Sequence, residues 1–241
     1  MPVFKLPEEL LFPPPDLAED SGLLAVGGDL CESRLLLAYS MGIFPWYSEG
    51  DPILWWSPDP RLVLFPDGLL ISRSLRQTIR KRTFSVTMDT AFEEVVSNCA
   101  AVHQKADGNT WITDEMIEAY TRLYHSGFAH SVEVWSEGEL VGGLYGMSLG
   151  SAFFGESMFT KKSDASKVAF VELAQYVMKW DFSFIDCQLT TPHLMSLGAR
   201  EIPRSEFLEA LASALKEPTK KGKWIREDNA GVPEKELSKK A

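Results

Sequence analysis

The sequence has little of what metal sites, disulfides and membrane spans require. Its three cysteines, Cys31, Cys99 and Cys187, show no CxxC spacing, and its four histidines are scattered, so no metal site is expected. This cysteine usage is typical of a reducing compartment and predicts a cytoplasmic protein. No apolar run approaches the roughly 20 residues that span a bilayer. The acidic, proline-rich start lacks the pattern of a secretory signal, so no membrane partner is expected.

Basic residues are outnumbered by acidic ones, 24 to 34, yet one segment concentrates positive charge. The net charge of −10 disfavours broad, nonspecific nucleic-acid binding. Residues 71–82 nevertheless contain five cations and no acid: Arg73, Arg76, Arg80, Lys81 and Arg82. In a helix, Arg73, Arg76 and Arg80, at spacings of three and four, would share one face, opposite an apolar stripe. The pattern favours contact with a phosphate-rich polymer, and a solvated helix face without a partner is the alternative.

The stretch Val141–Phe159 has the pattern of a strand, a turn and a second strand, and we place the active cleft there. Alternation along the second strand predicts that Phe154, Glu156 and Met158 share a face. A carboxylate between two apolar side chains must be hydrogen-bonded, paired or shifted in pKa. The glycines around it are expected where a ligand or another backbone comes close. The alternative is an edge strand with Glu156 in water.

A second polar pair occurs in Phe182–Leu189, which is predicted to be a buried strand. Alternation there places Phe184, Asp186 and Gln188 on one face. Packing does not require two polar side chains on an apolar strand, so they must satisfy each other or a ligand. The alternative without a function is that Asp186 and Gln188 only cap the end of the strand.

The remaining elements alternate between strands and helices. Trp46, in a proline-flanked loop, is a candidate for stacking on a nucleobase, whereas Trp55 and Trp56 are expected in the core. Strands are predicted over residues 84–88 and 131–135. Helices are predicted over residues 32–41, 90–101, 114–126, 165–180, 191–197 and 205–216. Residues 104–109 are expected to form a polar loop.

Several motifs, in order along nearly the whole chain, together resemble the leucyl/phenylalanyl-tRNA–protein transferase family. They are GLLAVGGDL (22–30), LLLAYSMGIFPWY (35–47), DPILWWSPDPR (51–61), TWIT (110–113), AHSVEVW (129–135), LVGGLYG (140–146), FGESMF (154–159), IDCQ (185–188) and SLGAREIPR (196–204). The resemblance implies an α+β fold with a small N-terminal domain (1–62) and an acetyltransferase-like, GNAT-type mixed-sheet domain with flanking helices (63–216). A charged, flexible tail (217–241) is expected to follow.

The resemblance also implies an activity and its partners. Leu or Phe, and less well Met, would pass from aminoacyl-tRNA to the N-terminal Arg or Lys of an acceptor protein, marking it for degradation. The ester is already activated, so acetyl-CoA, ATP and metal are not expected, and no cofactor is implied. The protein is expected to be a monomer.

The family pattern assigns roles to particular residues of this sequence. Glu156 and Gln188 would flank the reacting centre, with Asp186 supporting Gln188. Gln188 would hydrogen-bond the attacking amine or the ester carbonyl, and Glu156 would hold the ammonium or help to remove its proton. The residues expected to bind substrate are Trp46, Trp111, Tyr120, Leu144, Phe153 and Leu173, with Met147 as a further pocket candidate. The basic helix would contact acceptor-stem phosphates.

Two other classes of function remain as alternatives. An acyl-CoA-dependent N-acetyltransferase would need a glycine-containing pyrophosphate loop before a helix, but residues 159–166 contain no glycine. A noncatalytic RNA-binding module would use the basic helix and exposed tryptophans without depending on Glu156 or Gln188.

Overall fold

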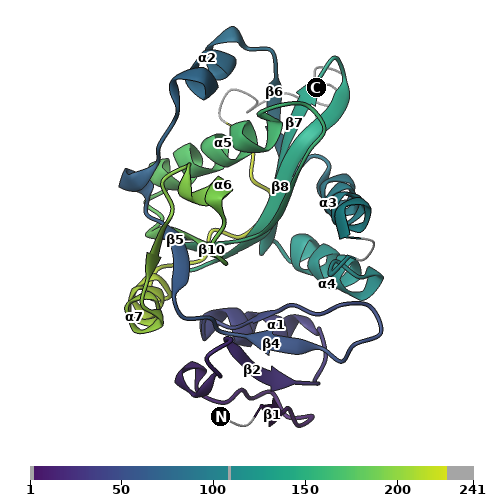
Figure 1. The fold of residues 1–241 in the computed structure, drawn as a ribbon, viewed down its shortest axis with the longest axis vertical. Coiled ribbons are helices and arrows are strands. Elements are labelled where there is room, and N and C mark those ends of the chain that lie inside the picture. Colours follow the sequence, from purple (N-terminus) through teal and green to yellow (C-terminus); the bar gives the residue numbers. More distant parts are fainter. Residues whose placement is uncertain (1–2, 108–109, 227–241) are drawn as a thin grey trace.

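The computed structural model describes residues 3–107 and 110–226, and its strands form two sheets (Figure 1). The expected α+β architecture, a small N-terminal unit before a larger mixed sheet with flanking helices, is confirmed. The small sheet has the strand order β1-β2-β4-β3. Its strands are β1 (Phe4–Lys5), β2 (Leu23–Val26), β3 (Phe44–Pro45) and β4 (Leu54–Trp56).

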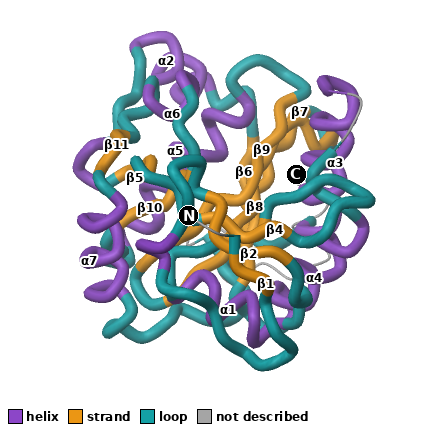
Figure 2. The backbone as a smooth tube through the Cα atoms, turned by 60° about the horizontal axis from the view of Figure 1, so that its bottom comes forward, coloured by secondary structure: helices purple, strands orange, loops and turns teal. Residues whose placement is uncertain are grey.

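Helix α1 (Glu32–Ser40) lies between the two sheets. Its expected C-cap, Gly42, has a φ of +72°, and an added Cβ would lie 2.7 Å from the ring of Phe207. Tyr39, near the end of the helix, is fully buried and is directed towards the larger sheet. Figure 2 views the molecule from the end that carries the small sheet, with β1, β2 and β4 in front.

The larger sheet has seven strands in the order β11-β5-β10-β9-β8-β7-β6. They are β5 (Arg61–Leu64), β6 (Ser85–Met88), β7 (Ala129–Ser136), β8 (Glu139–Leu149), β9 (Ala152–Thr160), β10 (Phe184–Gln188) and β11 (Arg200–Ile202). All neighbours are antiparallel except β9 and β10, which are parallel. The sequence did not predict β5 or β11, so the partner of β10 on its other side was missed.

Helices cover both faces of the larger sheet. They are α2 (Arg73–Lys81), α3 (Phe92–Asp107), α4 (Asp114–His125), α5 (Ala165–Lys179), α6 (Pro192–Met195) and α7 (Arg204–Ala214), with 3-10 turns at Pro15–Leu17 and Pro66–Gly68. Helix α5 packs on one face, and α3 and α4 pack on the other (Figure 1). The expected cap of α4 is confirmed, since the Thr113 hydroxyl accepts from the Met116 amide at 3.3 Å.

A bulge changes the predicted alternation along β9. Tyr145 pairs with Ser157 and Gly146 with Gly155, so Glu156 is an extra residue between two ladder pairs. Phe154 and Glu156 share a face as predicted, but Met158 packs with the cluster on the other face. The expectation that a glycine accompanies a close backbone is confirmed at Gly146, where an added Cβ would lie 2.1 Å from a carbonyl oxygen.

Two boundaries differ from the sequence predictions. Helix α3 continues to Asp107, because residues 104–106 are good helix formers and the first glycine follows at position 108. Residues 217–226 were expected to begin a flexible tail. They pack against the domain instead, as the burial of Trp224 (2% exposed) shows. Residues 227–241 and 108–109 lie outside the described residues, so the expectations for them stay predictions.

Candidate active site

The two parallel strands part at the point where the polar residues of β9 and β10 begin. Their last paired residues are Phe154 and Asp186. Beyond that pair, β10 has its own bulge at Cys187, and Gln188 has a φ of +60°. A cavity of about 370 Å³ lies at this opening, lined by residues 155–158 of one strand and 187–189 of the other, with helices α5 and α6 beside them. This size is within the range of small-molecule sites.

Asp186 is held by a buried arginine from β5. Its carboxylate accepts from Arg61 Nε at 2.8 Å and Nη2 at 2.6 Å, and both side chains are almost fully buried. The same carboxylate accepts from the backbone amide of Gln188 at 2.9 Å. Asp186 therefore fixes the backbone of Gln188, whereas the sequence led us to expect it beside the side chain.

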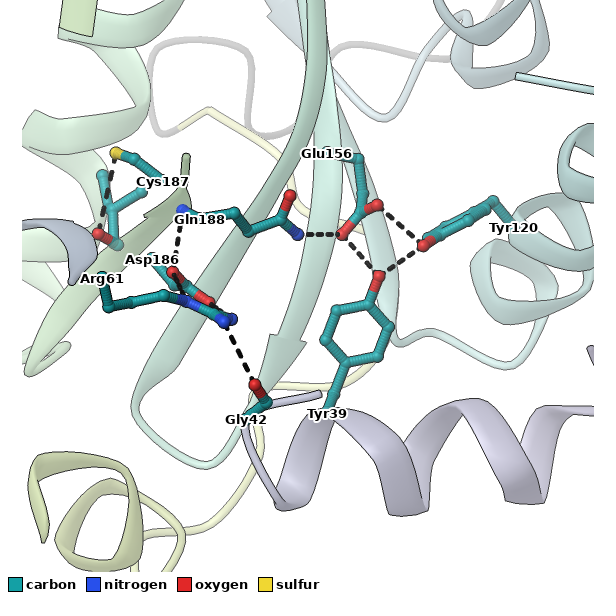
Figure 3. A network of polar contacts seen from close by, with 9 residues as sticks. Tyr39, Gly42, Arg61, Tyr120, Glu156, Asp186, Cys187 and Gln188 are labelled. Atoms are coloured by element: carbon teal, nitrogen blue, oxygen red, sulfur yellow. Dashed lines mark hydrogen bonds and ion pairs between the residues drawn. The ribbon is translucent and has the colours of Figure 1, made fainter. Parts of the chain in front are cut away.

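Glu156 receives three hydrogen bonds from three separate elements (Figure 3). Tyr39 of α1 donates at 2.6 Å, Tyr120 of α4 at 2.7 Å, and the Gln188 amide nitrogen at 3.1 Å. The hydroxyls of Tyr39 and Tyr120 also contact each other. The structure thus brings together Glu156, Asp186 and Gln188, which were predicted separately from two strands.

Burial determines the protonation of this carboxyl. Removal from water raises the pKa of Glu156 from its ordinary value of 4.5 to about 7, and the nearby Asp186 charge acts in the same direction. The hydrogen bonds from Tyr39, Tyr120 and Gln188 oppose that shift. A carboxylate offers about four acceptor sites, and three donors occupy three of them. Glu156 can therefore exchange a proton near neutral pH while one acceptor site remains.

The walls of the cavity are apolar and aromatic. Five of the six predicted substrate-binding residues line it: Trp46, Trp111, Leu144, Phe153 and Leu173. Trp46 is 38% exposed, and its ring centroid lies 5.6 Å from that of Trp56. Trp55 is in the core as predicted, and Trp56 is half-buried and packs against the same core. The sixth residue, Tyr120, is fully buried behind Glu156 and is not among the lining residues. Met147 also differs from expectation, because it packs in the core and does not line the cavity.

The basic segment forms helix α2, none of whose residues lines the cavity. The Ser72 hydroxyl caps it by accepting from the Leu75 amide, and Leu75 is buried as predicted. Its five cations are exposed: Arg73, Arg76, Arg80, Lys81 and Arg82. Within residues 3–107 and 110–226, no ion pair involves any of them. Their charge is therefore available to an external anion.

The start of α5 does not resemble a pyrophosphate site. Asp164 occupies the N-cap in a left-handed conformation, accepts from Thr78 at 3.2 Å and pairs with Lys167 at 3.7 Å. A carboxylate at this helix end would repel a bound phosphate. The structure thus gives no support to the acyl-CoA alternative.

Sequence reasoning missed two residues of the site, Arg61 and Tyr39. Both stand within the family-like motifs, but they are separated from their partners by 125 and 117 residues, respectively. The signal available was chemical: a buried Asp186 requires a cation, and a buried Glu156 requires hydroxyl or amide donors. Pattern alone could not select these particular residues as the donors.

Comparison with known proteins identifies consistent relatives. Residues 63–212 match the family described as leucyl/phenylalanyl-tRNA protein transferase, and residues 28–59 match the N-terminal domain of that family. A Desulfatibacillum aliphaticivorans protein is 59% identical, covering 96% of this chain and 100% of that protein. A Syntrophobacter fumaroxidans protein is 60% identical, covering 96% and 99%. Both are named leucyl/phenylalanyl-tRNA–protein transferase.

Solved structures are more distant. The structure of L-PGS from Bacillus licheniformis has a TM-score of 0.42 and 12% identity, covering 90% of this chain and 71% of that one. An aminoglycoside acetyltransferase from a soil metagenomic sample has a TM-score of 0.37 and 12% identity, covering 48% and 84%. Both scores are below 0.5, so neither bears on the chemistry of this site. Among the described residues, no helix is long and apolar enough to cross a membrane.

Proposed function

Because the chain belongs to the leucyl/phenylalanyl-tRNA protein transferase family, it is an aminoacyltransferase that acts between tRNA and protein, and we propose its substrates and site. The donor carries Leu or Phe, and less well Met. The acceptor is a protein with N-terminal Arg or Lys. The observation that carries the proposal is one cavity with apolar walls and a Glu156–Gln188 pair at its edge.

The reaction is attack by an amine on an ester. The N-terminal nitrogen adds to the ester carbonyl carbon, the bond to the tRNA ribose oxygen breaks, and a peptide bond and free tRNA result. An N-terminal amine has a pKa of about 7.7–8, so a useful fraction is neutral at physiological pH. Because the ester is already activated, the protein mainly has to position the two groups.

Gln188 orients the amine. Its amide nitrogen donates to Glu156 at 3.1 Å, which leaves its amide oxygen to accept from an N–H of the attacking amine. Arg61 and Asp186 hold the backbone of Gln188 in its left-handed conformation. Such support limits the displacement of the amide during the reaction.

Glu156 accepts the proton that the amine nitrogen loses as it bonds to the ester carbonyl carbon, and returns it to the departing ribose oxygen. Its pKa of about 7 is close to that of the amine, which favours proton transfer in either direction. The remaining acceptor site of the carboxylate is the place for that proton. Tyr39 and Tyr120 keep the carboxylate in position while its charge changes.

The aminoacyl side chain occupies the apolar part of the cavity, between Leu144, Phe153 and Leu173. The terminal adenosine stacks on Trp46 with Trp111 beside it. The exposed cations of α2 contact acceptor-stem phosphates. An apolar pocket of this kind separates Leu and Phe from polar side chains only moderately.

Both parts of the chain contribute residues to the site, and Arg61 stands at the start of β5, a strand of the larger sheet. Residues 1–62 supply Trp46, Tyr39 and Arg61, and residues 63–216 supply the strands that carry Glu156 and Gln188. We propose that the protein acts in the cytoplasm as a monomer, since one chain contributes all of these residues.

A direct transfer assay tests the proposal. The protein is incubated with labelled Leu-tRNA and a model protein beginning with Arg, beside a Gly-starting control, without ATP or CoA. Label moving only to the Arg-starting protein is expected. Label on both proteins, or on neither, contradicts the substrate assignment.

A matched pair of variants tests the site. Gln188→Ala is expected to lose most transfer while still binding tRNA, because the amine loses its acceptor. Thr190→Ala, which removes only a hydroxyl bonded to Glu201 at the surface, is expected to keep it. Full activity in a folded Gln188→Ala protein refutes the role of Gln188, and leaves the family assignment intact.

A further inference from the structure

A tryptophan C-terminal to residues 63–212, the part that matches the family description, packs against a residue of the cavity wall. The family match ends at residue 212, whereas the C-terminal segment (residues 215–226) crosses the domain beyond α7. Trp224 in this segment is 2% exposed, among the same buried cluster as Phe153, Leu144 and Leu173. Three of the proposed pocket residues therefore share their packing with a residue of the C-terminal segment.

Polar contacts fasten the C-terminal segment at several separate places. The Thr219 hydroxyl accepts from the Gly150 amide at 2.9 Å, and the Gly222 amide donates to the Gly127 carbonyl at 3.1 Å. The backbone amide of Trp224 donates to Asp89 at 2.7 Å, and its indole N–H donates to the Lys220 carbonyl at 3.1 Å. Both N–H groups of Trp224 are thus satisfied, which fixes the position and tilt of the ring.

Aromatic rings surround the indole. His130 stacks on it with centroids 3.8 Å apart and planes 10° apart, and Nδ1 of that imidazole lies 2.8 Å from the Asp89 carboxylate. Trp180 meets it edge-on at 4.9 Å. Phe182 also meets it edge-on at 5.9 Å, and the fourth neighbouring ring is that of Phe153, 5.8 Å away at 41°. Because its other neighbours are fixed, the indole acts as a firm support for Phe153.

Phe153 has little freedom on its other side. Its ring lies over Gly146, where an added Cβ would come within 2.7 Å of it. Phe153 lines the cavity, whereas Trp224, whose ring packs near that of Phe153, does not. The depth of the cavity at this wall therefore depends on how far back the indole allows the phenyl ring to sit.

We propose that Trp224 is a specificity-determining, positioning residue that acts through Phe153 and limits the size of aminoacyl side chain the enzyme accepts. The proposal rests on the proposed function, in which Phe153 borders the aminoacyl side chain. Trp224 does not touch that side chain. A smaller residue at 224 lets the Phe153 ring retreat, which deepens the pocket and favours Phe over Leu.

The test compares transfer from Phe-tRNA and Leu-tRNA at matched concentrations. The ratio of their kcat/KM values is expected to rise roughly tenfold in Trp224→Leu, the lower end for a pocket change of this size. Trp224→Phe, which keeps an aromatic ring and serves if the Leu variant does not fold, is expected to change the ratio less in the same direction. Lys221 lies in the same C-terminal segment and contacts the ring of Phe128; Lys221→Ala is expected to leave the ratio unchanged.

A double-mutant cycle separates positioning from general loosening of the fold. In a Phe153→Leu background, Trp224→Leu is expected to leave the ratio unaltered, because the ring that it supports is gone. Equal loss of transfer from both aminoacyl-tRNAs in Trp224→Leu overturns the inference in favour of a purely structural role. The inference is also overturned if Trp224→Leu leaves the ratio unchanged while Phe153→Leu alone changes it. If Phe153→Leu changes nothing either, the assignment of the pocket itself falls.

Discussion

The buried Arg61–Asp186 pair allows a test of whether the arginine stabilises the fold by pairing the Asp186 charge. Without Arg61, the Asp186 carboxylate would keep a single hydrogen-bond donor. In Arg61→Met, the Asp186 carboxylate loses the bonds of 2.6 and 2.8 Å and retains the Gln188 amide at 2.9 Å. The Gly42 carbonyl loses a donor at 3.1 Å as well. Removing one partner of a buried pair costs about 3–5 kcal/mol, a large part of the 5–15 kcal/mol that stabilises a typical domain.

Urea unfolding combined with the transfer assay measures both consequences. The free energy of unfolding should fall by about 3–5 kcal/mol in Arg61→Met. Arg200→Met, on the neighbouring strand β11 and exposed, should change it by less than about 1 kcal/mol. Arg61→Met combined with Asp186→Leu should regain much of the loss, because no unpaired charge remains. Aminoacyl transfer by this double variant should stay low, since the backbone amide of Gln188 has lost its acceptor, the Asp186 carboxylate.

Two results would refute this reasoning. One is an Arg61→Met protein within about 1 kcal/mol of the wild type, which would mean that Asp186 finds solvent or another donor. The other is a double variant no more stable than the single one, which would mean that packing of the arginine stem matters more than the charge. Full transfer in the double variant would separate Asp186 from the positioning of Gln188.

Two further predictions concern pH and salt. Because burial raises the pKa of Glu156 to about 7, the folded protein holds a proton that the unfolded chain releases between pH 4.5 and 7. The free energy of unfolding should therefore fall as pH rises through that window, by up to about 3 kcal/mol. Glu156→Gln should remove this slope in urea unfolding measured across pH, and an unchanged slope would assign it elsewhere. The triple variant Arg73→Ala, Arg76→Ala, Arg80→Ala should reduce the slope of log Kd for tRNA against log salt by about 2–3. Titrations at several salt concentrations measure it, and a wild-type slope would exclude these arginines from phosphate contact.

Much of the site could be predicted because its chemistry is concentrated in short motifs. Glu156 lies in FGESMF, and Asp186 and Gln188 lie in IDCQ, so strand periodicity was enough to mark them as inward-facing polar groups. Helix ends carried equally local signals, such as Thr113 before α4 and Gly42 after α1. Periodicity and caps depend only on near neighbours in the chain, which is why they were visible.

The features that sequence reasoning missed depend on partners distant in the chain. The bulge at Glu156 arises from the register of β8 against β9, and it moved Met158 to the other face. The short strand β5 has no alternation to mark it, because it is buried on both sides. Trp224 stands among charged residues, so composition suggested a mobile tail although one large ring is enough to anchor the segment.

The wide sequence separations within the site impose an order on synthesis. Tyr39 and Arg61 leave the ribosome early, but their partners Glu156 and Asp186 follow 117 and 125 residues later. The strands of the small sheet all come from residues 4–56, whereas Asp186 and Gln188 belong to β10 and are among the last residues of the site to be made. A nascent or truncated chain lacking β10 therefore has Tyr39, Arg61 and Glu156 but neither Asp186 nor Gln188.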